Sequence, residues 1–213
     1  KISTPVVTAG LTNGISLLME LFVDEGDSVV VPDMFWGNYR LMIEERQKAS
    51  IAAFPFYTEK KGLNIPGFVE TIKKTAINKK AVVIVNFPNN PTGYSPSKTE
   101  AIELKNALVS VAEEGYKLLV VTDDAYFGLF FNDDTYCHSL FNELYDAHEN
   151  ILAAKVDGTT KEHFVWGFRI GFVTFGSKAM TADKYKVLET KLSAAIRASI
   201  SNCSRPAQSL LLK

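Results

Sequence analysis

The chain of 213 residues is 46% hydrophobic and 22% charged, a balance typical of a soluble globular protein with a sizeable core. Its formal net charge of −1 and its lack of a lysine and arginine cluster disfavour a nucleic-acid surface, so small molecules are the expected partners. Its two cysteines, Cys137 and Cys203, lack zinc-finger spacing, and no apolar run is long enough to cross a bilayer, which indicates a cytoplasmic protein without a metal site, a disulfide scaffold or a membrane partner.

The spacing of apolar residues predicts alternating helices and strands. A helix is expected at 13–23, where Ile15, Leu18 and Phe22 share one face, and a strand is expected at the β-branched run 28–31. The pattern continues in chain order with helix 39–47, strand 50–54, helix 68–75, strand 81–86, helix 97–114, strands 117–122, 151–156 and 168–175, helix 184–198 and a helix from about residue 205. This order predicts a three-layer α/β/α fold with a mostly parallel sheet. No repeat or flexible linker divides the chain, so one domain is expected.

Three polar segments follow predicted strands: residues 86–93 (NFPNNPTG), 123–126 (DDAY) and 157–161 (DGTTK). In an open parallel sheet, ligands bind at the carboxyl ends of the strands. The sequence therefore predicts that the three segments meet at one edge of the sheet and form a binding site there.

Each of these features has an ordinary explanation when it is taken alone. Asn and Pro occur in many turns. Asp123 is a possible helix cap, Trp36 a possible core residue and Lys161 a possible surface charge, because an ammonium group is rarely buried without a partner. The order in which the features occur is more specific than any one of them.

In that order the sequence resembles the large domain of the fold-type I aminotransferases of class I and II, which use pyridoxal phosphate (PLP), and it is aspartate aminotransferase-like. The resemblance runs from about Thr8 to Ser201. It rests on a glycine-containing turn, an aromatic residue, Asn-Pro-Thr-Gly, Asp-x-x-Tyr, a lysine and an arginine, in the order of the family.

The resemblance implies the catalytic residues. Lys161 would form a Schiff base with the aldehyde of the cofactor and then move a proton between the substrate and the cofactor. Asp123 would pair with the pyridine nitrogen and keep it protonated. Asn90 and Tyr126 would donate hydrogen bonds to the phenolic oxygen, and Trp36 would stack on the ring.

The resemblance also implies a phosphate site, which would be formed by Gly10, Leu11, Thr12, Gly158, Thr160 and Arg169. The backbone N–H groups at a helix N-terminus bind anions, and an arginine adds a bidentate contact. One position departs from the family pattern. Where many members have a serine that donates to the phosphate, this sequence has Gly158, and Thr160 is the candidate to compensate.

The implied substrate contacts are Trp36, Asn90 and Arg197. Arg197 resembles the arginine that aspartate-type members place across a dimer interface to bind the distal carboxylate of a substrate. A surface charge on a helix is the alternative interpretation. The resemblance thus implies a homodimer that binds an amino acid and a 2-oxo acid.

We expect the chain to be a fragment, because it begins at Lys1 and stops within a helical pattern. It would be the PLP-binding large domain, residues 1–213, without the N-terminal segment and the C-terminal small domain, and inactive by itself. The implied reaction of the whole protein is transamination. A PLP-dependent C–S β-lyase, which uses the same cofactor residues, is the alternative. A transcription regulator with a domain of this kind would need a DNA-binding segment before Lys1.

Overall fold

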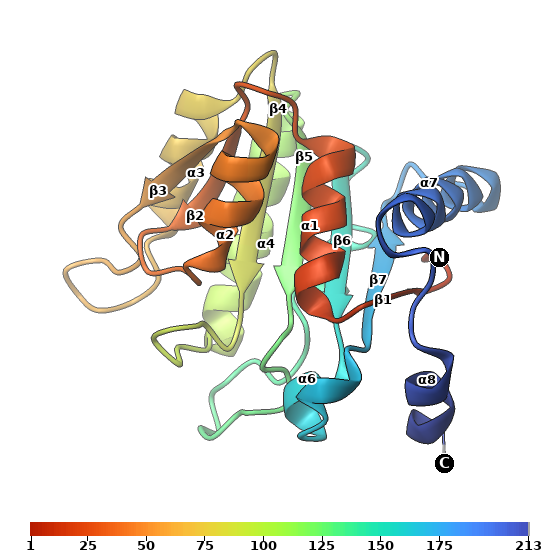
Figure 1. Ribbon diagram of the computed structural model, residues 1–213. Coiled ribbons are helices and arrows are strands. Elements are labelled where there is room, and N and C mark those ends of the chain that lie inside the picture. Colours follow the sequence, from red (N-terminus) through yellow and green to blue (C-terminus); the bar gives the residue numbers. More distant parts are fainter. Residues whose placement is uncertain (213) are drawn as a thin grey trace.

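The computed structural model describes residues 1–212 and contains a seven-stranded sheet between two layers of helices (Figure 1). The strands are β1 (Val6–Thr8), β2 (Ser28–Pro32), β3 (Ser50–Phe54), β4 (Lys80–Asn86), β5 (Lys117–Asp123), β6 (Ile151–Asp157) and β7 (Gly171–Gly176). They lie in the order β1-β7-β6-β5-β4-β2-β3, and within residues 1–212 only β7 runs antiparallel to both of its neighbours. The predicted α/β fold with a mostly parallel sheet is confirmed.

The helices form a layer on each face of the sheet. In front in Figure 1 are α1 (Leu11–Phe22) and α2 (Asn38–Arg40), which continues as the π-helical segment η1 (Leu41–Glu45). Behind the sheet are α3 (Ile65–Thr75) and α4 (Lys98–Glu113), with α5 (Phe141–Leu144) packed against α4. The remaining helices are α6 (Thr159–Glu162), the 3₁₀ turn η2 (Trp166–Phe168), α7 (Ala182–Ile200) and α8 (Arg205–Leu211). No helix in residues 1–212 has both the length and the apolar character needed to span a membrane.

The central strands are buried on both faces, which explains their continuous apolar sequences. Successive side chains of a strand point to opposite faces. In β5, Val121 therefore enters the core beneath α1, whereas Val120 enters the core beneath α4. The same alternation at the end of the strand sends Asp123 to the α1 face and Asp124 to the α4 face.

Some of the predicted elements are wrong in their bounds. The strand expected at 168–175 begins only at Gly171, because residues 166–168 form a 3₁₀ turn and Arg169 has a left-handed backbone with φ 53°. The helix expected at 39–47 is α2 followed by the π-helical η1. The short elements β1, α5 and α6 were not predicted, because three or four residues are too few for an apolar period. The other predicted elements are confirmed, with ends that differ by a few residues.

A capping box at the start of α4 also fixes the loop that follows β4. Ser97 Oγ accepts a hydrogen bond from Glu100 N at 3.2 Å, and Glu100 Oε2 accepts one from Ser97 N at 2.9 Å. Glu100 Oε1 accepts further bonds from the hydroxyl of Tyr94 and from Leu63 N. One carboxylate thus joins the helix start to the end of the polar segment after β4.

We expect Ser97→Ala to lower the free energy of unfolding by about 1 kcal/mol, because the N-cap side chain no longer satisfies a backbone N–H group. Urea unfolding of the purified protein measures the change. Thr99→Ala, an exposed position in the first turn of the same helix, is the matched control and should change stability by less than about 0.5 kcal/mol. Equal losses in the two variants would contradict a role for the cap.

Candidate active site

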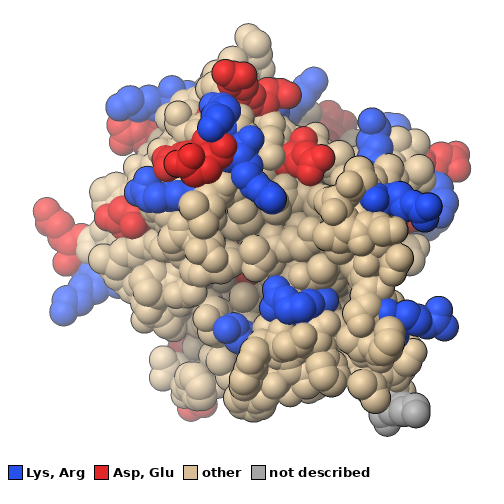
Figure 2. Space-filling view, viewed as in Figure 1, with Lys and Arg blue, Asp and Glu red and all other residues tan. Residues whose placement is uncertain are grey.

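The three polar segments meet in one cavity at the carboxyl ends of the central strands, which agrees with the expected location. The cavity encloses about 290 Å³ and is lined by Leu11, Thr12, Ile15, Trp36, Asn86, Asn90, Asp123, Ala125, Tyr126, Thr160, Lys161, Trp166 and Arg169. In Figure 1 the carboxyl ends of β4, β5 and β6 point downward, toward α6. In Figure 2, charges of both signs gather at the upper end of the molecule, while separate basic groups stand on a mostly uncharged surface in the lower half.

Most of the site residues expected from the sequence line this cavity, and three do not. Gly10 and Gly158 lie directly behind the wall, where Gly10 faces Arg169 and Gly158 faces Leu11. Arg197 is exposed on α7 and does not line the cavity. The structure therefore brings together the expected cofactor residues within this chain, and it leaves the substrate role of Arg197 as a prediction.

Asp123 is the last residue of β5 and is buried. Its Oδ2 accepts a hydrogen bond from Tyr39 Oη at 2.5 Å, and its Oδ1 accepts one from Ala125 N at 3.2 Å. Burial raises the pKa of Asp123 to about 6, while the bonds from Tyr39 and Ala125 favour the carboxylate and limit the rise. Burial also raises the pKa of Tyr39 well above its ordinary value, so the phenol keeps its proton and can donate a hydrogen bond to Asp123. Above pH 6 the cavity thus contains a buried anion that can pair with a cationic group.

Tyr39 is a residue that sequence reasoning missed. It was expected only as the start of a helix, yet its ring is 1% exposed and packs edge-on against Trp36 with ring centroids 5.7 Å apart. The available signal was its position three residues after Trp36, which places both side chains on one side of a helical turn. Tyr39 links the aromatic side of the cavity to its carboxylate.

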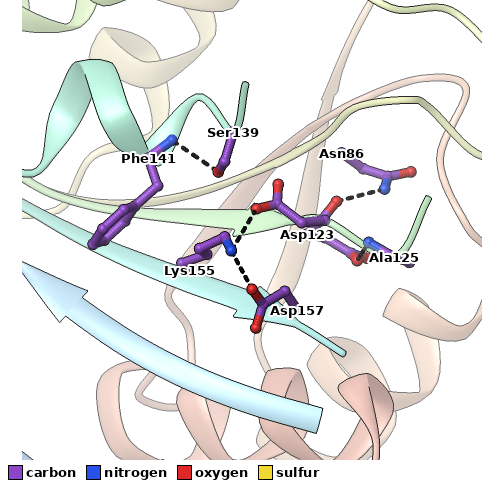
Figure 3. A network of polar contacts seen from close by, with 8 residues as sticks. Asn86, Asp123, Ala125, Ser139, Phe141, Lys155 and Asp157 are labelled. Atoms are coloured by element: carbon purple, nitrogen blue, oxygen red, sulfur yellow. Dashed lines mark hydrogen bonds and ion pairs between the residues drawn. The ribbon is translucent and has the colours of Figure 1, made fainter. Parts of the chain in front are cut away.

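Asn86, at the end of β4, connects two of the converging segments. Its Nδ2 donates to the carbonyl of Asp123 at 2.8 Å, as Figure 3 shows, and its Oδ1 accepts from Asn90 N at 2.7 Å. The parallel register already pairs Asn86 with Asp123. Asn90 is therefore placed beside the end of β5 by backbone and side-chain contacts that act together.

Lys161 lies at the mouth of the cavity. It belongs to α6, the four-residue helix that follows β6, and the residue is exposed although its side chain lines the cavity. Its Nζ is 5.4 Å from the centroid of the Tyr126 ring, which is a cation–π contact. The amine is thus next to an aromatic side chain and in the same cavity as Asp123.

One end of the cavity fits an anion such as phosphate. Gly10 caps α1 with φ 83°, and a β-carbon there would lie 2.4 Å from Arg169 Nη2, so only glycine lets the guanidinium pack against the helix start. Arg169 Nη1 also donates to Trp166 O at 3.0 Å. The buried Thr160 Oγ1 has no hydrogen-bond partner within residues 1–212. Free helix N–H groups, a guanidinium and an unpartnered hydroxyl together supply the donors that a phosphate group needs.

Gly158 is required by close packing rather than by its backbone angles. A β-carbon at this position would lie 2.6 Å from the carbonyl oxygen of Ile170, 2.9 Å from Leu11 Cδ1 and 3.0 Å from Gly171 Cα. The neighbouring atoms include backbone, which cannot move aside easily. This packing explains why the serine found in many members of the family would not fit here.

Comparison with known proteins agrees with the family resemblance found in the sequence. A family model described as aminotransferase class I and II matches residues 1–213. The aspartate aminotransferase of Bacillus sp. (strain YM-2) is 25% identical over an alignment that covers 83% of this chain, and that of Pyrococcus horikoshii is 26% identical over 84%. Each alignment covers 42% of the relative. The crystal structure of an aminotransferase from Anaerococcus prevotii superposes with a TM-score of 0.89 and 28% identity, over 100% of this chain and 51% of that one. The chain thus spans about half the length of these relatives, or less.

The fold and these comparisons place the chain in the class of pyridoxal phosphate-dependent aminotransferase domains. Within that class, the chain belongs to the aminotransferase class I and II family. The resemblance found in the sequence is confirmed.

We expect Gly158→Ser, which introduces the serine common in the family, to destabilise the protein by about 1–3 kcal/mol, because the added atoms overlap backbone. Thermal or urea unfolding measures this loss. Gly167→Ser is the matched control, since a β-carbon at Gly167 meets nothing within 4 Å. A variant at 158 as stable as the wild type would show that the packing around Leu11 and Ile170 can relax.

We expect Tyr39→Phe to raise the pKa of Asp123 above its value of about 6, because a hydrogen bond that favours the carboxylate is removed. The folded-state pKa already lies above the ordinary value of 3.8, so the stability linked to this group is complete at low pH and is lost as pH rises through about 6. In the variant this loss should extend to higher pH. Carbon NMR titration of labelled aspartate, with Asp123→Asn to assign the signal, measures the shift. Tyr57→Phe is the control, and an unchanged titration in Tyr39→Phe would contradict the role of the phenol.

Proposed function

We propose that the whole protein transfers an amino group between an amino acid and a 2-oxo acid, with PLP bound in the cavity of this chain. The observation that carries the proposal is the meeting of Lys161, the buried Asp123 and the anion site at Arg169 in one cavity. Bound PLP supplies an aldehyde and a cationic ring that accepts the electrons released when a bond to the substrate Cα breaks. The family membership and the aspartate aminotransferase relatives support this reaction.

The phosphate would be held by Arg169, by the hydroxyl of Thr160 and by the backbone N–H groups of Leu11 and Thr12. The positive end of the α1 dipole and the guanidinium both favour a dianion. Thr160 supports this assignment most directly, because its buried hydroxyl has no other acceptor or donor within residues 1–212. A ligand oxygen would remove the cost of burying that hydroxyl without a partner.

Asp123 would accept a hydrogen bond from the protonated pyridine nitrogen. Its carboxylate is buried, so its attraction to a cation is little reduced by water. A cation beside it would lower its pKa from the raised value of about 6 and keep it ionised at neutral pH. Tyr39, which bonds Oδ2, would keep the carboxylate in one orientation while the remaining lone pairs receive the ligand.

Asn90 and Tyr126 would donate hydrogen bonds to the phenolic oxygen, and Trp36 would cover one face of the ring. Trp36 is itself fixed by its edge-on contact with Tyr39. A flat apolar surface excludes water and orients the ring, which favours cleavage of the Cα bond that stands perpendicular to it. Substrate binding would use Trp36 and Asn90 as well.

Lys161 Nζ would first carry the cofactor covalently and then remove a proton from the substrate Cα and deliver it to the cofactor side. Its place at the mouth of the cavity, with Asp123 inside and Tyr126 beside it, supports both tasks. A lysine on a short helix after a rigid strand can swing its flexible side chain between two acceptors without a backbone change.

We also propose that this chain is the PLP-binding domain of a longer protein that acts as a homodimer in the cytoplasm. The first part is supported by its coverage of only 42% of its relatives. Near the cavity, Phe164 and Trp166 are 77% and 59% exposed, as expected for side chains that another subunit or domain covers. The exposed Arg197 would reach a substrate across the interface. Both cysteines are free, which fits a reducing compartment.

We expect borohydride reduction in the presence of PLP to label Lys161 with a phosphopyridoxyl group, which peptide mass spectrometry detects. Lys161→Ala should lose the label. Arg169→Ala should still be labelled at Lys161 but should bind PLP about 10- to 100-fold more weakly, since charge-assisted bonds to the phosphate are lost. Lys178→Ala, an exposed lysine outside the cavity, is the control. Equal labelling of many lysines at low PLP would contradict a built site.

The reaction is distinguished by its products. The whole protein should convert an amino acid and a 2-oxo acid into the exchanged pair in equal amounts, without ammonia. Release of ammonia and a thiol from a cysteine conjugate would instead show the C–S lyase reaction on the same cofactor residues.

A further inference from the structure

Behind the cavity, on the α4 face of the sheet, one lysine contacts both of the segments that follow β5 and β6 near the proposed cofactor. Lys155 lies on β6 and pairs in the ladder with Thr122 of β5. Its Nζ is 3.9 Å from Asp124 Oδ2, forms an ion pair and hydrogen bond with Asp157, and is 5.6 Å from the centroid of the Phe127 ring. Figure 3 shows Lys155 between Asp157 and the end of β5. We call Lys155, Asp124, Asp157 and Phe127 the rear cluster.

Each of the other three residues of the rear cluster is the direct neighbour of an expected cofactor residue. Asp124 follows Asp123, Phe127 follows Tyr126, and Asp157 precedes Gly158 at the start of the turn that leads to Lys161. Adjacent residues share a planar peptide unit of fixed length. A displacement of a side chain and its Cα in the rear cluster is therefore passed on to a residue at the cavity.

The contacts join the ends of β5 and β6, where the ladder stops. Asp124 N donates to Val156 O at 2.9 Å, and the register ends with Asp123 opposite Val156. Beyond this point no β5–β6 ladder bond holds the Tyr126 segment against the Lys161 turn within residues 1–212. On the α4 face, the ammonium of Lys155 connects the two strand ends across the gap.

Lys155 also supplies the positive charge beside the two carboxyl groups of the rear cluster. Asp124 is 4% exposed and its Oδ2 has no hydrogen-bond partner within residues 1–212. Burial raises the pKa of Asp124 to about 8, and nearby Asp157 and Asp123 add to the rise, while Lys155 and Ser139 oppose it. Without the ammonium, the pKa of Asp124 would rise further, and Asp124 and Asp157 would lose the one cationic group within the rear cluster that contacts both of them.

We propose that Lys155 is a positioning residue for the cofactor site: from the opposite face of the sheet, it holds the ends of β5 and β6 at the spacing that lets Asp123, Tyr126 and Lys161 act on one ligand. The inference rests on the proposed function for its catalytic meaning. Its structural part concerns this chain alone and can be tested without a cofactor.

The test compares Lys155→Met with Lys80→Met. Lys80 is a matched control, because it also lies on a strand and bridges two aspartates, Asp24 and Asp27, at 2.8 and 2.7 Å, but at the amino end of β4. Amide hydrogen exchange is measured on the protein without PLP. Lys155→Met should speed exchange in residues 123–127 and 157–162 and leave the other strands unchanged, whereas Lys80→Met should leave these two segments unchanged.

PLP binding is measured in the same variants by titration and by borohydride labelling of Lys161. Lys155→Met should weaken binding by about tenfold or more, since Asp123, Tyr126 and Lys161 would no longer be placed to contact one ligand together. Lys155→Arg should restore binding and slow exchange, because it returns a cation to the rear cluster. Asp157→Asn removes one contact only and should give an intermediate effect, which keeps the test usable if Lys155→Met does not fold.

The two proposals fail in different ways. Wild-type protein that does not bind PLP would overturn the proposed function, while the exchange data would still test the contacts of Lys155. Normal exchange and normal PLP affinity in Lys155→Met would overturn the positioning role. A uniform rise in exchange along the whole chain, equal to that in Lys80→Met, would also overturn it, because it would show a general loss of stability.

Discussion

The parallel pairing of β4, β5 and β6 is the constraint on which the site depends. Strands that run in the same direction end at the same edge, and each of these strands ends in a polar residue, Asn86, Asp123 or Asp157. The apolar residues before them hold the strands in register by filling two cores. The positions of the polar groups are therefore determined by the burial of side chains that take no part in the chemistry.

The alternation of side chains gives two neighbouring acids different surroundings. Asp123 faces α1 and the cavity and receives a hydrogen bond from Tyr39, whereas Asp124 faces the opposite side and meets Lys155. Burial raises the pKa of both, to about 6 and about 8. The lower value belongs to the carboxyl group with two hydrogen-bond donors, which is the one suited to pair with a cationic ligand at neutral pH.

Small residues shape the proposed anion site as much as the donors do. Gly10 leaves room for the guanidinium of Arg169, and Gly158 lets the turn after β6 pass close to the start of α1 and to β7. Thr160, whose buried hydroxyl has no hydrogen-bond partner in the described residues 1–212, lies two residues later in that turn. Gly158 stands where the resemblance implied a serine, and the close packing around it leaves no room for a side chain.

The sequence by itself determined the fold class, most of the strands and helices, and most of the residues that line the cavity. It did so because apolar periodicity depends on neighbours a few residues apart, and because the order from Gly10 through Asp123 and Lys161 to Arg169 is specific to one family. Only the tertiary structure decided which distant groups meet. Tyr39 bonds an acid 84 positions away, and Lys155 contacts Asp124 only because β5 and β6 end together. Such contacts follow from the packing of the whole chain, which leaves no periodic trace in the local sequence.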